Sequence, residues 1–331
     1  MARILLTYPA GFRRMYYGDE ALARLREAGE VVLNETDETL PLDRLIELAR
    51  ECDVIVADRT TAGPAAVFDR LPNLVAFVRG AVDIRNVDVE AASRSGVLVT
   101  RASPGFIDSV TELGVGFMVA LGRGIASATE DYHAGRDPEV RMGVQLGGAT
   151  LGVIGYGAIG RRFAQAGKDL GMRVLVSDPY ATIDDLEIRQ LDLKALLGES
   201  DFVVCLAVAT EETENLIDAD ALTAMKPTAY FINLSRGNLV DEAALARALG
   251  ENRIAGAAMD VGRAFDQKPS PELAALPNVV ATPHIGGLTP EAAFHQSKET
   301  AAQVAEIVRG RAPKGAVNAE RARRLGRLAG S

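Results

Sequence analysis

The stretch 149–178, ATLGVIGYGAIGRRFAQAGKDLGMRVLVSD, constrains the fold of this 331-residue chain more than any other part. A short apolar run predicts a β-strand at 151–154, apolar residues at helical spacing predict a helix over 158–170, and 173–177 predicts a second strand. Three glycines have the spacing G-x-G-x-x-G where the first strand meets the helix: Gly155, Gly157 and Gly160. This order of elements indicates a β-α-β unit that binds a dinucleotide.

Each glycine has a physical role in such a unit. Gly155 permits the sharp turn, Gly157 leaves room for a pyrophosphate beside the backbone, and Gly160 lets the helix pack closely on the strand. The helix N-terminus offers N–H groups and a positive dipole end to the phosphates. Asp178 ends the second strand about 20 residues later, where its carboxylate can accept ribose hydroxyls and would repel a 2′-phosphate. The motif favours NAD over NADP; a glycine-rich turn that only packs is the alternative.

Composition limits the other possibilities. The length fits about two domains, and 48% hydrophobic residues allow a large core. A net charge of −9 and a pI near 5.1 argue against nucleic acid or an anionic membrane as the main partner. With no apolar run of spanning length and no signal-peptide pattern, we expect a cytoplasmic protein. Two isolated cysteines indicate neither disulfides nor a metal site, and Cys205 is expected in the core.

Residues 1–100 alternate short apolar runs with helical patterns, which predicts a parallel sheet covered by helices on both faces. Strands are predicted at 3–7, 30–34, 53–57, 73–78 and 96–100, and helices near 19–28, 41–51, 64–70 and 88–95. The segment 11–18, GFRRMYYG, is predicted to be an irregular surface loop, or a lid near a substrate. A long helix over 104–122 and another over 123–135 follow, and His133 is expected to be a solvated residue of the latter.

After the glycine motif, the pattern fits a doubly wound sheet with ligands at the carboxyl ends of its strands. Strands are predicted at 201–208, 229–233, 254–260 and 278–282, and helices near 193–198 and 241–250. A helix over 290–309 is expected to cover the first domain. The basic end, 309–331, is expected to be a solvated tail or a short docked segment, not a nucleic-acid arm.

Charged or titratable residues follow three of the late strands, where a packed core would not place them: Arg236, Asp260 and His284. A guanidinium there can bind a carboxylate bidentately and polarise a carbonyl. A histidine there can donate a proton to a carbonyl oxygen as hydride reaches its carbon. The alternatives are an ion pair of Arg236 with Asp241 or Glu242, and a structural histidine. His295 is expected on a helix face, although it could reach a cleft.

Together these features resemble the D-isomer-specific 2-hydroxyacid dehydrogenase family. The resemblance spans nearly the whole chain through VRGAVDIRNVDVEAASRSGVLVTRASPG, GVIGYGAIG, INLSRGNLVDEAALARAL, AGAAMDV and LPNVVATPHIGGLTPEA. It implies an α/β fold of two similar doubly wound parallel-sheet domains with a cleft between them, and usually a homodimer. A Rossmann NAD-binding domain, 101–285, would be inserted in a flavodoxin-like substrate domain, 1–100 plus 286–331.

The resemblance also implies residue roles. Arg236 would hold the substrate, His284 would be the general acid/base, and the loop 79–83, with Ala81 and Val82, would bind the substrate carboxylate. The implied cofactor-binding residues are Gly155, Gly157, Ala158, Ile159, Gly160, Asp178, Ala207, Val208, Thr213, Leu234, Ser235, Arg236, Asp260, His284 and Gly287.

Three departures from the family pattern matter. The family's Glu, five residues after the strand-ending Asp, is Phe265 here; we expect Asp266, with Glu272 behind it, to orient His284 and favour its acid form. The family's G-x-G carboxylate loop is Ala81-Val82-Asp83, which is unfavourable unless Asp83 points away. The family's His-x-Pro is replaced by 206–208, which should contact the cofactor by packing and backbone.

The predicted function is hydride transfer between NAD(H) and a 2-oxo acid/D-2-hydroxy acid pair, with Arg236, Asp266 and His284 as the catalytic residues. A small acid is the expected partner, without nucleic acid or membrane. The alternative is a non-enzymatic NAD(H)-binding regulator or corepressor on the same scaffold; a formate-type dehydrogenase is a weaker rival. Family frequency alone suggests glyoxylate or hydroxypyruvate as substrate.

Overall fold

The computed structural model describes residues 1–328, which divide into two compact units. Unit 1 contains residues 1–106 and the described residues from Leu288 onward, and unit 2 is Ile107–Gly287. Both units are of α/β type, each built on one parallel sheet. The predicted fold class is confirmed.

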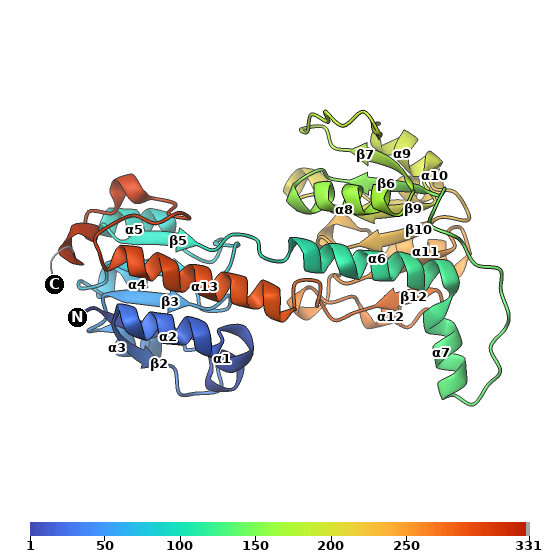
Figure 1. Ribbon diagram of the computed structural model, residues 1–331. Helices are drawn as coiled ribbons and strands as arrows, with labels where there is room; N and C mark the ends of the chain where they lie inside the picture. Colours follow the sequence, from blue (N-terminus) through green and yellow to red (C-terminus); the bar gives the residue numbers. More distant parts are fainter. Residues whose placement is uncertain (329–331) are drawn as a thin grey trace. The chain divides into compact units, whose positions relative to one another are not determined.

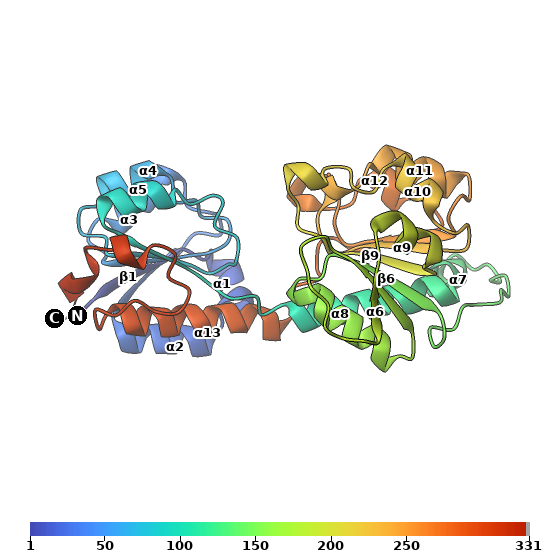
Figure 2. The same cartoon turned by 90° about the horizontal axis from the view of Figure 1, so that it is seen from above.

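The described part of unit 1 has a five-stranded parallel sheet in the order β2-β1-β3-β4-β5. The strands are β1 (Arg3–Leu6), β2 (Glu30–Leu33), β3 (Val54–Ala57), β4 (Ala76–Arg79) and β5 (Leu98–Arg101). Apolar side chains of α3 (Leu42–Ala49), α4 (Ala65–Arg70) and α5 (Val89–Ser95) pack on one face of this sheet. Those of α2 (Asp19–Ala28) and α13 (Pro290–Ile307) pack on the other (Figure 2). This strand order is that of a flavodoxin-like fold.

The prediction of an irregular loop over 11–18 was wrong. The segment forms α1 (Ala10–Tyr16), which begins after Pro9 and is followed by Gly18 in left-handed backbone. The rings of Phe12 and Tyr16, one helical turn apart, are 5.9 Å from each other. Arg13 donates to the main-chain oxygen of Asn34, which holds the helix against the loop after β2. The aromatic residues thus contact each other within the helix, and Arg13 contacts the neighbouring loop. Local composition did not indicate these contacts.

The basic C-terminal segment is docked as far as Leu328, and its last residues, 329–331, lie outside the described part. Ala316 pairs with Thr100 of β5 in antiparallel fashion, and Val317 N–H donates to Val99 O at 2.9 Å. The chain then forms the short helices η4 (Ala319–Arg321) and η5 (Leu325–Leu328). The segment covers β5, which is an edge strand of the sheet.

Unit 2, all of whose residues are described, has a seven-stranded parallel sheet in the order β12-β11-β10-β9-β6-β7-β8. The strands are β6 (Thr150–Ile154), β7 (Arg173–Ser177), β8 (Ile188–Gln190), β9 (Phe202–Cys205), β10 (Tyr230–Asn233), β11 (Gly256–Met259) and β12 (Val279–Ala281). The order reverses at β6, as in a doubly wound dinucleotide-binding sheet. The prediction missed β8, because only one of its three residues is apolar and buried.

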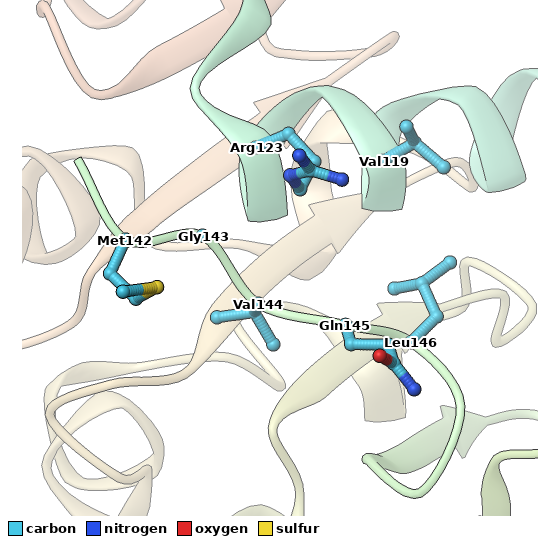
Figure 3. A pocket seen from close by; sticks show the side chains of 7 residues that line it. All are labelled: Val119, Arg123, Met142, Gly143, Val144, Gln145 and Leu146. Atoms are coloured by element: carbon cyan, nitrogen blue, oxygen red, sulfur yellow. The ribbon is translucent and has the colours of Figure 1, made fainter. Parts of the chain in front are cut away.

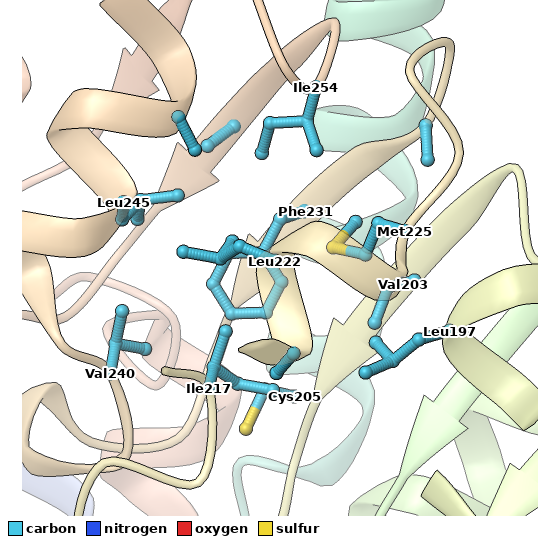
Figure 4. Close-up of a cluster of buried hydrophobic side chains, with 14 of the residues drawn as sticks. Leu197, Val203, Cys205, Ile217, Leu222, Met225, Phe231, Val240, Leu245 and Ile254 are labelled. Atoms are coloured by element: carbon cyan, nitrogen blue, oxygen red, sulfur yellow. The ribbon is translucent and has the colours of Figure 1, made fainter. Parts of the chain in front are cut away.

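Helices cover both faces of this sheet (Figure 2). One face carries α9 (Leu193–Glu199), α10 (Ala219–Ala224), α11 (Glu242–Gly250) and α12 (Pro271–Ala274). Their apolar side chains surround Phe231 and Cys205 in the core (Figure 4). Cys205 is buried as predicted, and burial raises the pKa of its thiol to about 12.

The other face of the unit 2 sheet carries α6 (Ile107–Arg123) and α8 (Ala158–Asp169). One glycine inside α6 has a clear packing reason, since a Cβ at Gly114 would lie 2.3 Å from the Phe163 ring of α8. The next helix, α7 (Ile125–His133), is followed by 134–149, which has neither helix nor strand (Figure 1). Within residues 1–328 no single helix has the length and hydropathy of a membrane span; α6 and α7 reach them only together, across a 70° bend.

Candidate active site

The carboxyl ends of the unit 2 strands form the edge at which most predicted site residues gather. Because β10, β11 and β12 are parallel neighbours in register, Asn233, Met259 and Ala281 lie side by side. The chain leaves the sheet just after these residues, toward Arg236, Asp260 and His284. The glycine motif leaves β6 at the same edge.

The three glycines have the geometry that their spacing predicts. Gly155 has φ +92°, and a Cβ there would lie 2.7 Å from Ala207 Cα, so only glycine fits the turn. A Cβ on Gly160 would lie 2.1 Å from Gly155 O, so the helix packs tightly on the strand. A Cβ on Gly157 would meet nothing within 4 Å. This open space lies at the N-terminus of α8, whose first turn has neither a side-chain cap nor an acidic residue, and it therefore suits an anion.

Asp178 is half-buried beside this turn. Its Oδ2 accepts the N–H of Tyr156, inside the glycine motif, at 2.7 Å, and its Oδ1 accepts the N–H of Tyr180 at 2.9 Å. Each carboxylate oxygen has a second lone pair, which a ribose hydroxyl can use. Asp178 therefore shapes the glycine loop in addition to its predicted contact with a ribose.

The segment after β9 follows the glycine turn closely. Ala207 abuts Gly155, and its carbonyl accepts the hydroxyl of Ser235, so the loops after β9 and β10 are tied together. Val208 is exposed, whereas the Thr213 hydroxyl donates to Val208 O at 2.8 Å. Ala207 thus joins the loop after β9 to the glycine motif, whereas Thr213 bonds inside that loop.

Arg236 follows β10 in a loop shaped by Asn233. The buried Asn233 amide donates to Arg236 O at 3.0 Å and accepts the N–H of Ser235 at 3.1 Å. The half-buried guanidinium of Arg236 donates to Ser235 O at 2.7 Å. Gly237 comes next, and a Cβ there would lie 2.1 Å from the backbone of Gly262. The loops after β10 and β11 are therefore in direct contact.

His284 is half-buried and has left-handed backbone, with φ +61°. Its Nδ1 lies 3.0 Å from the main-chain oxygen of Asp266. A carbonyl only accepts hydrogen bonds, so Nδ1 carries the hydrogen and the neutral ring has its lone pair on Nε2. Asp266 and the residue after it are also left-handed, at φ +58° and +60°. Such backbone is uncommon outside glycine and gathers at functional sites.

Asp260 anchors the histidine loop. It is only 3% exposed, and its Oδ1 accepts the Thr282 hydroxyl at 2.6 Å and the Ile285 N–H at 2.8 Å. Its Oδ2 accepts the Gly286 N–H at 2.8 Å. These donors flank His284 on both sides, so a buried carboxylate fixes the backbone that presents the imidazole.

The remaining residues of the predicted histidine partner segment are solvent-facing. Phe265, at the position of the family's Glu, is 92% exposed. Glu272 lies exposed in the first turn of α12. Within this segment, the main-chain oxygen of Asp266 lies within hydrogen-bond distance of His284, and the predicted role of the Asp266 carboxylate stays a prediction.

The predicted substrate loop of unit 1 follows β4. The buried Arg79 guanidinium donates to main-chain oxygens of Asp58, Thr61 and Asp83, and burial lowers its pKa. Ala81 and Val82 are half-buried. Asp83 accepts Nη2 of Arg85 at 2.6 Å, so its charge is paired.

The other two histidines differ in their surroundings. His133 is exposed at the end of α7, as predicted. His295, on α13, has Nε2 2.8 Å from the Ser103 hydroxyl and 3.6 Å from Glu299. Glu299 also accepts the Ser103 N–H at 2.6 Å. His295 is therefore part of a polar cluster within unit 1.

A hollow of about 350 Å³ lies elsewhere in unit 2, between α6 and the segment after α7 (Figure 3). It is lined by Val119, Arg123, Met142, Gly143, Val144, Gln145 and Leu146. None of the predicted site residues is among them.

Comparison with known proteins identifies the family and the fold. Residues 115–286 match the family model described as D-isomer specific 2-hydroxyacid dehydrogenase, NAD binding domain. A solved structure, that of the TT0316 protein from Thermus thermophilus, is similar with a TM-score of 0.83 and 30% identity, over 95% of this chain and 99% of that chain.

Curated relatives span most of the chain. A D-3-phosphoglycerate dehydrogenase of Methanocaldococcus jannaschii is 34% identical over 96% of this chain, which spans 60% of that protein's length. A hydroxypyruvate reductase of Thermotoga maritima is 34% identical, and the match covers 81% of this chain and 90% of that protein. A glyoxylate reductase of Pyrococcus furiosus is 32% identical, and the match covers 91% of this chain and 93% of that protein. The chain therefore belongs to the D-isomer specific 2-hydroxyacid dehydrogenase family.

Proposed function

We propose that this protein is an NAD(H)-dependent oxidoreductase that interconverts a 2-oxo acid and the D-2-hydroxy acid. The main support is the carboxyl edge of unit 2, where Asp260 anchors the loop of His284 beside the Arg236 loop and the glycine motif. Unit 2 would be the NAD-binding domain and unit 1 the substrate domain. A regulator without turnover remains the rival, but the relatives named above are enzymes.

The residues of unit 2 fit a dinucleotide. The open space at Gly157 and the N–H groups of Ala158, Ile159 and Gly160 would hold the pyrophosphate. Asp178 would accept the ribose hydroxyls, and its charge would repel a 2′-phosphate, so NAD(H) is preferred over NADP(H). Residues lining the nicotinamide side would be Ala207, Val208, Leu234, Ser235, Asp260 and Gly287. Bound NADH would supply hydride to the carbonyl carbon of the acid.

Proton transfer is the task of His284. Since the Asp266 carbonyl holds Nδ1–H, the proton that moves is the one on Nε2. This orientation lets the imidazolium donate to the substrate oxygen and the neutral ring accept in the reverse direction. Asp266 would thus orient the catalytic histidine through its main chain.

Arg236 would bind the substrate. Its planar guanidinium can hold a carboxylate and the adjacent carbonyl oxygen, and the attraction grows as negative charge develops on that oxygen. In unit 1, the backbone of Ala81 and Val82 would bind the carboxylate. Pairing of Asp83 with Arg85 reduces the repulsion that an acidic residue would cause there.

The substrate class follows from the relatives rather than from a defined pocket. Among the relatives above, the two that match this chain over 90% or more of their own length are named hydroxypyruvate reductase and glyoxylate reductase. We therefore propose a small, polar 2-oxo acid of this kind as substrate.

We also propose a homodimer. Large apolar side chains stand exposed on α7 and the segment after it, including Tyr132, Val140 at 98% exposure and Met142 at 99%. Exposed apolar groups gathered in one stretch are typical of a protein interface. The proposed occupant is the same surface of a second copy.

The test is oxidation of NADH or NADPH against a panel of 2-oxo acids. We expect turnover with NADH and one or two small acids, and at least about tenfold lower kcat/KM with NADPH, the order of one ribose-specific contact. Tight NADH binding without turnover on any acid would contradict the proposal and support the regulator. Equal turnover with both cofactors would contradict the role of Asp178.

A further inference from the structure

The guanidinium of Arg263 lies where loops from three neighbouring strands meet at the carboxyl edge of unit 2. Its Nη2 donates to Glu214 Oε1 at 2.8 Å and to Asn215 Oδ1 at 2.6 Å, in the loop after β9. The same nitrogen donates to Asn238 O at 2.9 Å, and Nε donates to Val240 O at 3.1 Å, in the loop after β10. The planar fork of one arginine thus joins two loops to its own.

The backbone of Arg263 is fixed as well. Its N–H donates to Glu242 Oε1 at 2.8 Å, at the start of α11. A Cβ on Gly237 would lie 2.1 Å from the backbone of the preceding residue, Gly262, and a Cβ on Gly262 would lie 2.5 Å from Pro269 Cα, so neither position has room for a side chain. The side chain of Arg263 therefore attaches the loop after β11 to the loop that contains Arg236, and its backbone attaches it to the start of α11.

The loop that Arg263 anchors also holds the catalytic histidine. Gly262 N–H donates to Gln267 O at 2.7 Å, and Ala264 N–H donates to Lys268 O at 3.0 Å, so the chain folds back on itself. At its tip, Asp266 presents its carbonyl to His284 Nδ1 from left-handed backbone. Left-handed backbone persists in a non-glycine residue only where the surroundings impose it. The Arg263 contacts supply such surroundings.

We propose that Arg263 is a positioning residue that holds the loop of Asp266 against the loops after β9 and β10, and thereby orients His284. This rests on the proposed function, because the orientation matters for proton transfer. The hydrogen bonds of Arg263 are with the neighbouring loops and the start of α11, so it acts on His284 through the loop that carries the Asp266 carbonyl.

Charge alone does not explain this arrangement. The side chains of Arg263 and Glu214 are 39% and 43% exposed, and an ion pair of that kind contributes little to stability. The Asn238 amide and the Arg263 guanidinium hold the pKa of Glu214 below its usual range, so the acceptor stays ionised. Arg263 donates from two nitrogens held in one plane, Nε and Nη2, to different loops. Lysine has a single nitrogen and does not reproduce this geometry.

The experiment compares Arg263→Lys and Arg263→Gln with the wild type and with the control Arg189→Gln. Arg189 forms an ion pair with Glu199, also exposed, in the same unit but away from this edge. Misplacing a group that orients the reaction lowers the rate by about 10- to 100-fold. We therefore expect kcat to fall by that factor in both Arg263 variants, and lysine should not restore it. The Kd of NADH should stay within about threefold, since the glycine motif is untouched, and the control should be normal.

A second readout does not require turnover. In the nitrogen-15 spectrum of the imidazoles, assigned with His284→Gln, wild-type His284 should show the Nδ1–H form, and Arg263→Gln should show a mixture of both neutral forms. An unchanged His284 spectrum together with wild-type kcat, or a lower Tm with unchanged kcat, would overturn the inference. If the wild type turns over no acid but the spectrum changes, the proposed function fails and the positioning role stands.

Discussion

At the scale of single residues, Asp260 is the side chain that anchors the loop of His284. The sequence places it at the end of a buried strand, where an ionised carboxylate needs hydrogen bonds to offset its burial. The structure supplies them from Thr282, Ile285 and Gly286, around the histidine. A residue expected at the nicotinamide thus also sets the shape of the His284 loop.

Asp260→Asn tests this anchoring role. The amide nitrogen is a donor and cannot accept from Ile285 or Gly286, so one main-chain N–H loses its partner and the loop shifts. We expect a roughly 10²-fold lower kcat, within the range of about 10²–10⁴ expected for His284→Ala, which removes the acid itself. Steady-state kinetics with NADH measure both variants. A fully active, folded Asp260→Asn enzyme would refute the anchoring role.

Residue contacts of this kind divide into those that sequence spacing reveals and those that it does not. Arg236, Asp260 and His284 stood out because each follows an apolar strand. Arg263 did not, because its partners lie on loops far away in the chain and no local pattern announces them. The same holds for the Asp266 carbonyl, since a main-chain contact leaves no trace in residue type.

At the scale of elements, most helices and strands follow from periodicity, and the exceptions are short or stabilised from outside. Local composition does not predict α1, which is held in part by hydrogen bonds with the loop after β2. The sequence alone is compatible with a solvated C-terminal tail or a docked segment. Hydrogen bonds along β5 show that the segment is docked. Both cases involve partners that are distant in sequence.

Asn318 is the residue through which the docked segment can be tested. Its side chain is buried; Oδ1 accepts Val99 N–H at 2.8 Å, and Nδ2 donates to Val97 O at 2.9 Å and Ser93 Oγ at 2.9 Å. Each buried group left unpaired costs about 1–3 kcal/mol, so Asn318→Ala should lower the free energy of unfolding by about 2–4 kcal/mol.

Urea unfolding would measure the effect of Asn318→Ala, with Asn86→Ala, at an exposed loop position, as the control. The control should change stability by less than about 0.5 kcal/mol. An equal midpoint for wild type and Asn318→Ala would show that the segment does not stabilise unit 1. NADH binding to unit 2 should be unchanged in both variants.

At the scale of the whole molecule, the exposed apolar stretch after α7 bears on assembly. A light-scattering mass of twice the 35.1 kDa chain is expected for the wild type. The double variant Val140→Asp/Met142→Asp should be monomeric, since burying two charges in an apolar interface is unfavourable. Leu186→Asp, at an equally exposed apolar residue elsewhere in unit 2, should remain dimeric. A monomeric wild type would contradict the proposed homodimer.

The sequence by itself determined the α/β class, the family and the strands that carry the site. These depend on local features of the sequence: apolar periodicity, glycines where a tight turn requires them, and polar residues at strand ends. The glycine motif is the strongest case, because the positive φ of Gly155 and the close packing of Gly160 on Gly155 O both belong to the same short β-α-β unit.

Only the tertiary structure decided how the site is held. That His284 Nδ1 meets the main chain of Asp266, that Asp260 fixes its loop and that Arg263 joins three loops are consequences of which strands become neighbours. A hydrogen bond depends on distances of a few tenths of an ångström between segments far apart in the chain. Residue type and spacing specify which segments form strands, but not which strands become neighbours or the final positions of the atoms beyond their ends.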